Sequence, residues 1–169
     1  VVIPTFAIER AQELMFYLSQ LVRDERVPAL PVFLDSPMAR EVTEAFRRHP
    51  EVLDEDARRL FASGESPFDF PGLVIVRTIE DSKNINSRRG PAVIMAGSGM
   101  CTGGRIKHHL LWNLGRPEST ILFVGYQARE TLGRQILEKQ PQVRVLGQTV
   151  PVRARIAKIN GFSAHADQK

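Results

Sequence analysis

The amino-acid sequence predicts an α/β fold in which helices cover both faces of a mostly parallel β-sheet. Three observations support this prediction. Short apolar segments alternate with segments whose apolar residues recur at helical spacing, which implies successive βαβ units. Residues 91–96 are wholly apolar, as is typical of a strand buried on both faces of a parallel sheet. The 169 residues suit one domain.

The elements follow from local patterns taken in order. The expected strands are residues 1–3, 31–34, 73–77, 91–96 and 120–124. The expected helices are residues 8–21, 37–48, 103–115 and 131–139, with one or two helical turns at 82–87. Asp35-Ser36-Pro37 is typical of a helix start, with proline at the first helical position, and Gly115 with Pro117 marks a helix end. Residues 50–71 predict a short helix and then an irregular excursion. Residues 143–159 alternate polar and apolar side chains, which favours a β-hairpin over a buried parallel strand.

Composition sets broad limits on the class of protein. Hydrophobic residues make up 43% of the chain and charged residues 25%, as in an ordinary globular domain. The apolar runs are far shorter than the roughly 20 residues of a membrane helix, and the first residues lack a signal-peptide pattern. Cys101 is the one cysteine, which excludes an internal disulfide and fits a cytoplasmic location. The net charge of +4 suits either a polyanionic partner or a basic surface without one.

The strongest local feature is the glycine-rich segment 96–105, between an expected buried strand and an expected helix. Its four glycines, at positions 97, 99, 103 and 104, allow a ligand to approach the main chain. The N–H groups at the start of the following helix suit phosphate, and Ser98, Thr102 and Arg105 would add donors. The alternative is a tight turn without a ligand, because the spacing matches neither the dinucleotide-binding nor the P-loop pattern.

Histidines provide the second set of candidates. His165 is flanked by small residues and followed by an aspartate, so it is either a proton donor or phosphate contact in a cleft, or a structural residue. His108 and His109 are adjacent in a helix and face different directions, so one of them is expected to cap or pack rather than to bind metal. The chain contains no HxHxDH, HExxH or CxxC pattern, and by itself cannot assemble an ordinary catalytic zinc site.

Several smaller features are expected at the carboxyl ends of the strands, where ligands of open parallel sheets gather. Thr5 is a candidate cap for the first helix, and Arg10 is expected to face the same edge. Asp35 is either a helix cap or a ligand residue. Ser98 and the Gly125-Tyr-Gln segment belong to the same edge.

Six segments in order resemble the β-CASP domain of metallo-β-lactamase-fold RNA nucleases. They are PTFAIERAQEL, DSPMA, FASGESPFDFPG, IMAGSGMCTGGRIKHHL, FVGYQARETLGRQI and GFSAHAD. The resemblance covers essentially the whole chain. It is strongest to bacterial and archaeal relatives of the pre-mRNA 3′-end cleavage endonuclease, and weaker to ribonuclease J and Artemis.

The resemblance implies a division of the chain and a set of partners. Residues 1–150 would form the β-CASP domain, and residues 151–169 would lead back into a metallo-β-lactamase domain. Two zinc ions in that domain would generate the attacking hydroxide, while this chain alone would hold none and be inactive. Single-stranded RNA would pass between the two domains. A membrane partner is not expected, and a homodimer is left open.

The resemblance also assigns roles to residues. His165 matches the histidine that the family places beside the scissile phosphate, and Asp35 does not match the family's acidic motif, which would lie upstream. The expected RNA or phosphate contacts are Arg10, Ser98, Gly99, Met100, Thr102, Gly103, Gly104, Arg105 and Ser163. Two alternatives to a zinc ribonuclease stay open, a non-catalytic RNA-binding or scaffold paralogue and a nucleotide-binding module. Cleavage within RNA or from its 5′ end is also left open.

Overall fold

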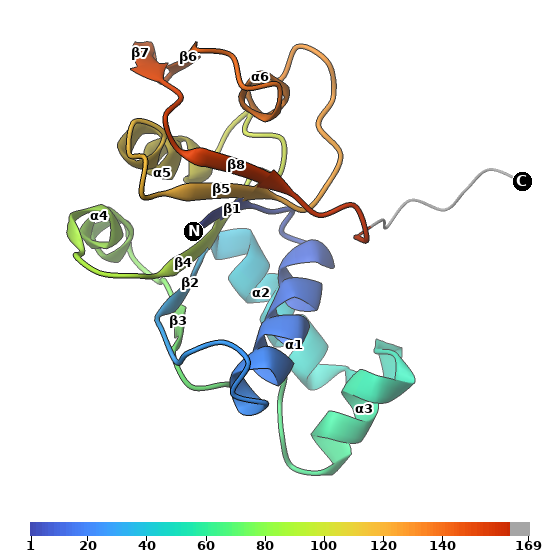
Figure 1. Cartoon of the computed structure of the whole chain (residues 1–169). Helices are drawn as coiled ribbons and strands as arrows, with labels where there is room; N and C mark the ends of the chain where they lie inside the picture. The colour runs from blue at the N-terminus through green and yellow to red at the C-terminus, as the bar shows by residue number, and fades with distance from the viewer. Residues whose placement is uncertain (163–169) are drawn as a thin grey trace, which may run out of the picture.

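A six-stranded, wholly parallel β-sheet forms the centre of the chain in a computed structural model that describes residues 1–162 (Figure 1). The strands lie in the order β3-β2-β4-β1-β5-β8. Their bounds are β1 (Val2–Pro4), β2 (Val32–Asp35), β3 (Leu73–Ile75), β4 (Val93–Ala96), β5 (Thr120–Phe123) and β8 (Arg155–Lys158). All four residues of β4 are buried, as its apolar sequence predicts. The predicted α/β class is confirmed.

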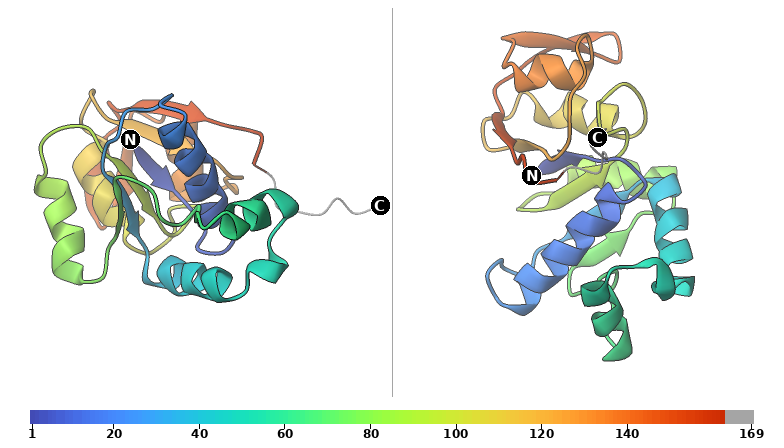
Figure 2. Two further views of the ribbon diagram at one scale, coloured as in Figure 1. Left: turned by 90° about the horizontal axis from the view of Figure 1, so that it is seen from below. Right: turned by 90° about the vertical axis from the view of Figure 1, so that its right-hand side faces the viewer.

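Helices cover the two faces of this sheet (Figure 2). They are α1 (Arg10–Arg23), α2 (Pro37–Arg48), α3 (Glu55–Ala62), α4 (Ile79–Ser87), α5 (Ile106–Asn113) and α6 (Leu132–Leu137), with a 3-10 turn at Pro50–Val52. One buried cluster, including Met15 and Leu34, joins the sheet to α1 and α2. The other, including Leu110 and Ile136, joins it to α5 and α6. Side chains from both faces of the strands therefore enter a core.

The first helix begins later than its periodicity predicts. It starts at Arg10, and Glu9 occupies the N-cap position without a side-chain cap. The prediction that Thr5 caps this helix is wrong, because a turn separates Thr5 from α1. The Thr5 hydroxyl is buried and has no hydrogen-bond partner among residues 1–162. The next helix start is as predicted: Pro37 is the first helical residue, and the Ser36 hydroxyl accepts a hydrogen bond from the Ala39 amide at 3.2 Å.

The alternating segment near the end of the chain contains two kinds of strand. Strands β6 (Gln142–Val145) and β7 (Gln148–Pro151) form the expected antiparallel hairpin. Its two-residue turn, Leu146 and Gly147, has positive φ angles at both positions. Strand β8, however, pairs in parallel with β5 at the edge of the main sheet. The hairpin prediction is wrong for that part, because a half-exposed edge strand shows the same period of two as a hairpin strand.

The arrangement of the sheet places several loops together. Because all six strands run in the same direction, the segments that follow β1, β2, β4, β5 and β8 lie at one edge, here called the carboxyl edge.

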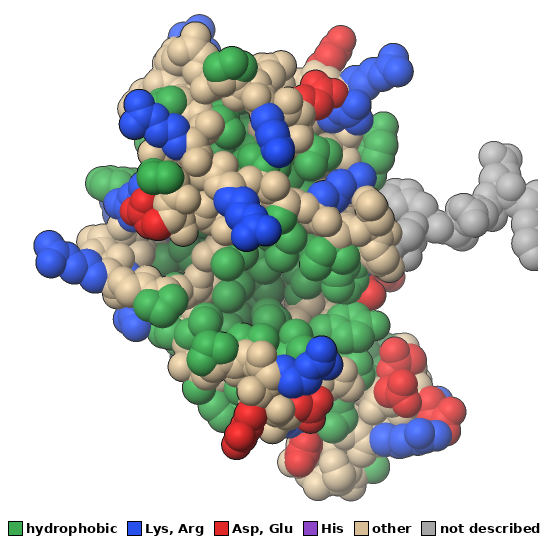
Figure 3. Space-filling model, viewed as in Figure 1, with side chains coloured by type: hydrophobic (Ala, Val, Ile, Leu, Met, Phe, Trp, Pro, Cys, Tyr) green, Lys and Arg blue, Asp and Glu red, His purple; other side chains and the backbone are tan. Residues whose placement is uncertain are grey.

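The face seen in Figure 3 has hydrophobic side chains across its middle, and its acidic side chains gather mainly below. None of the helices within residues 1–162 is long and apolar enough to span a bilayer.

Candidate functional site

The glycine-rich loop between β4 and α5, residues 97–105, is the centre of the carboxyl edge. Hydrogen bonds hold it from within and from a neighbouring segment. The Ser98 amide donates to the Gly103 carbonyl oxygen at 3.0 Å. The Gln127 side-chain amide donates to the Gly99 carbonyl oxygen at 2.9 Å, and the Gly133 amide donates to the Met100 carbonyl oxygen at 3.1 Å. The loop is therefore fixed in shape, as a preorganised binding surface requires.

At two of the four positions only glycine fits, because neighbouring atoms occupy the place of a Cβ atom. A Cβ atom on Gly104 would lie 2.4 Å from the carbonyl oxygen of Gly97, and Gly104 has a φ of 77°. A Cβ atom on Gly99 would lie 2.6 Å from the ring of Phe6. Around Gly103, by contrast, nothing lies within 4 Å of such an atom. Tight packing thus explains part of the glycine pattern.

The N–H groups at the start of α5 are not the free donors that the sequence suggested. The amides of Ile106 and Lys107 donate to the carbonyl oxygens of Gly97 and Gly104 at 3.0 and 3.3 Å. The unused donors lie earlier, in the loop itself. No hydrogen bond among the described residues uses the amides of Gly99, Met100 or Thr102. A phosphate at this edge would therefore meet loop amides rather than the helix terminus.

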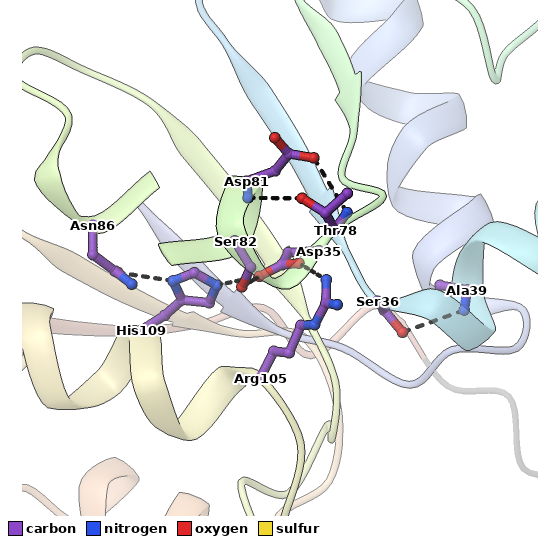
Figure 4. A network of polar contacts seen from close by, with 9 residues as sticks. All are labelled: Asp35, Ser36, Ala39, Thr78, Asp81, Ser82, Asn86, Arg105 and His109. Carbon is purple, nitrogen blue, oxygen red and sulfur yellow. Dashed lines mark hydrogen bonds and ion pairs between the residues drawn. The ribbon is translucent and has the colours of Figure 1, made fainter. Parts of the chain in front are cut away.

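Arg105 reaches the carboxyl edge, where it pairs with Asp35 (Figure 4). Its Nη1 atom lies 2.5 Å from Oδ1 of Asp35, whose side chain is fully buried. The same carboxylate accepts hydrogen bonds from the Ser82 hydroxyl at 2.5 Å and from Nε2 of His109 at 2.7 Å. Burial alone would raise the pKa of Asp35, but the hydrogen bonds from His109, Ser82 and Arg105 outweigh it and lower that pKa. Asp35 caps no helix.

His109 continues this network into the core. It is fully buried, and its Nδ1 atom lies 2.9 Å from Oδ1 of Asn86 in α4. The carboxylate, the imidazole and the amide thus join β2, α4 and α5. His108 is exposed, so the prediction that one histidine of the pair packs is confirmed. Within residues 1–162, no group of three or more His, Cys, Asp and Glu side chains is placed to hold a metal ion.

Of the other predicted site residues, three lie at the carboxyl edge and two lie outside the described residues. Arg10 lies at the carboxyl edge but is buried, with its guanidinium paired to Glu13 and 5.2 Å from the ring centre of Phe162. Ser98 and Thr102 lie together in the glycine-rich loop, with their hydroxyl oxygens 3.2 Å apart. Ser163 and His165 lie outside the described residues.

The structure adds Phe6, Phe162 and Lys158, which sequence reasoning missed, to Met100 and Tyr126, which it had placed at this edge. A cavity of about 570 Å³, here called the aromatic hollow, opens at the carboxyl edge beside the glycine-rich loop. Phe6, Tyr126 and Phe162 line it, together with Met100 and Lys158. A second cavity, of about 490 Å³, lies between the ends of β1, β2 and β4 and shares Phe6 with the first. For Phe6 the available signal was an aromatic residue just after β1.

Comparisons of the chain with known proteins and protein families give consistent results. A family model described as the Beta-Casp domain matches residues 11–136. Another, described as the Zn-dependent metallo-hydrolase RNA specificity domain, matches residues 149–169. The chain is 45% identical over 168 residues to Ribonuclease TTHA0252 of Thermus thermophilus, covering 99% of this chain and 38% of that protein. It is 34% identical over 174 residues to transcription termination factor FttA of Methanosarcina mazei, covering 99% of this chain and 27% of that protein. The chain thus spans well under half the length of these relatives.

Proposed function

Because this chain belongs to the Beta-Casp domain family, we propose that it is the RNA-binding part of a zinc-dependent ribonuclease. The substrate would be single-stranded RNA, whose phosphodiester bonds are hydrolysed. The relative named a ribonuclease supports this proposal, as does the match of residues 149–169 to an RNA specificity domain. We further propose cleavage within the RNA. We also propose a cytoplasmic location, which the free, buried Cys101 supports.

The observation that carries the proposal is the fixed glycine-rich loop at the carboxyl edge. Its amides at Gly99, Met100 and Thr102 are unused by other described residues, and Ser98 and Thr102 add hydroxyl groups. Main-chain amides and hydroxyls contact RNA phosphates without reading the base sequence. The loop would therefore position the RNA backbone rather than select its sequence.

Arg105 would add a positive charge to this surface. Only its Nη1 atom is hydrogen-bonded to Asp35, and its side chain is 20% exposed and lines the second cavity. The remaining N–H groups of the guanidinium point to a phosphate contact oriented by Asp35. For Arg10 the geometry supports an indirect role, because its charge is already paired with Glu13 and it lies against Phe162.

Zinc would be held elsewhere in the longer protein. Among residues 1–162, no cluster of suitable zinc ligands is present. The contribution of this chain would be to bind and orient the RNA. His165 would in addition give a proton to the leaving oxygen of the phosphodiester. Ser163 would contact the same phosphate.

The test is a cleavage assay with the full-length protein and labelled single-stranded RNA, with and without zinc. We expect zinc-dependent internal cleavage by the full-length protein and none by the isolated 169-residue chain. His165→Ala should lower kcat by roughly a hundredfold or more while changing KM little, as expected for loss of a general acid. Equal losses in affinity and turnover would argue that His165 only binds. Full zinc-dependent cleavage by the isolated chain would refute the proposal.

A second candidate is an RNA-binding protein that acts without cleavage. The relatives named transcription termination factors give a specific reason to keep it. The same assay separates the two. RNA binding by the full-length protein without zinc-dependent cleavage would favour the second candidate.

A further inference from the structure

The aromatic hollow places two packed phenylalanine rings and one exposed tyrosine ring beside the glycine-rich loop. Phe6 is 40% exposed, yet its ring packs directly on the backbone of Gly99 and lies near Gly125. Tyr126 is 62% exposed near the start of the loop that follows β5. Phe162 is anchored by Tyr17, with ring centres 5.7 Å apart and the rings edge to face. Two anchored rings next to an exposed tyrosine offer a flat ligand a surface for stacking.

Polar groups beside the rings suit an anion. Lys158, the last residue of β8, is exposed, lines the hollow and forms no ion pair among the described residues. Met100, whose amide is unused, lines the same cavity. Glu9 is the one carboxylate of the lining, and the charge of Arg10 is compensated by Glu13. A flat apolar surface next to a free cation and a free amide matches the chemistry of a nucleotide.

We propose that the aromatic hollow is a base-stacking site for single-stranded RNA. One unpaired base lies against Tyr126 and Phe6, and Lys158 holds the phosphate beside that base. This inference rests on the proposed function and deepens it, because the glycine-rich loop contacts only the RNA backbone. Stacking tolerates any base, since every base has a π face, and it requires the strand to be unpaired. The hollow therefore explains how the protein selects single strands.

The position of the stacked base relative to the cleaved bond follows from the sequence. Phe162 precedes the proposed catalytic His165 by three residues. We therefore expect the stacked base to lie within a few nucleotides of the cleaved phosphodiester. Removal of that base should weaken binding, whereas removal of a base elsewhere should not.

The experiment scans a single abasic nucleotide along a single-stranded RNA that the full-length, zinc-loaded protein cleaves. At one position the abasic nucleotide should raise KM by roughly five- to 150-fold, as expected for loss of one base–aromatic contact. Tyr126→Ala should raise KM for the intact RNA by a similar factor and remove the penalty at that position. Tyr126→Phe should keep both the affinity and the penalty, since the ring rather than the hydroxyl is used.

The matched control is Trp112→Ala. Trp112 is also exposed, at 54%, but it lines a different cavity with Asn113 and Arg116. Trp112→Ala should leave both KM and the abasic penalty unchanged. Because Tyr126 is mostly exposed, its replacement should also leave the midpoint of thermal unfolding within a few degrees of the original.

Four results would overturn the inference, and the first three leave the proposed function intact. Cleavage without any position-specific abasic penalty would remove the stacking site and leave the proposed function intact. A penalty that persists in Tyr126→Ala would place the stacked base elsewhere. A lowered unfolding midpoint with an unchanged KM would show that protein, not RNA, covers Tyr126. Failure of the full-length protein to bind or cleave any RNA would overturn both this inference and the proposed function.

Discussion

Replacement of Asp35 by alanine tests the buried network that joins β2 to α4 and α5. The Asp35 carboxylate is fully buried and accepts hydrogen bonds from three side chains, Ser82, His109 and Arg105. Asp35→Ala removes all three acceptor contacts at once. His109 is itself fully buried, so its Nε2 atom would lose its partner in a place that water does not reach.

The magnitude follows from this geometry. Removal of one partner from a buried charged network typically costs about 3–5 kcal/mol, because the remaining groups stay desolvated. A typical domain has a free energy of unfolding of about 5–15 kcal/mol, so the variant should fold but with a large share of its stability lost. The matched control is Asp69→Ala, since Asp69 is exposed and forms no ion pair among the described residues. Its effect should stay within about 0.5 kcal/mol.

The assay is hydrogen exchange of the full-length protein, read by mass spectrometry on peptides that cover α4 and α5. At neutral pH, the free energy of opening for these helices should fall by about 3–5 kcal/mol in Asp35→Ala. The difference in this free energy between Asp35→Ala and the original protein should become smaller at acidic pH. The pKa of Asp35 is lower in the folded state, so its stabilising effect is present above its ordinary carboxyl range and is lost as the pH falls below about 4. A fall of less than about 1 kcal/mol at neutral pH would refute the reasoning.

Three further predictions concern the glycine-rich loop. Gly104→Ala should destabilise the protein by at least about 1–3 kcal/mol in a denaturant titration, because its φ is positive and a carbonyl oxygen blocks the Cβ, whereas Gly103→Ala should be tolerated. Arg105→Ala should weaken RNA binding and reduce the slope of log K against log[salt] by about 0.7, and an unchanged slope would leave Arg105 only a partner of the buried carboxylate. Burial raises the pKa of Cys101 to about 12, so iodoacetamide should fail to modify it in the native protein at pH 8 and modify it after denaturation. Rapid native labelling would contradict that prediction.

The local elements of the fold followed from the sequence because each depends on neighbours in the chain. The buried strand β4, the Ser36 cap of α2 and the hairpin of β6 and β7 are set by apolar runs, a cap residue and a turn. Element ends were less exact. The α1 helix begins after a turn that no local pattern marks, and β8 shares its alternation with a hairpin strand.

The sequence by itself determined the βαβ order, the place of the glycine-rich loop at a strand end and the likeness to a family. Only the tertiary structure decided which side chains meet there. Asp35 and Arg105 are 70 residues apart, and their contact depends on β2 and β4 being neighbours in the sheet. Phe6 and Tyr126 line one hollow because β1 lies beside β5. Local periodicity reports which side of an element is buried, but strand order fixes the partners, and it arises from packing between distant segments.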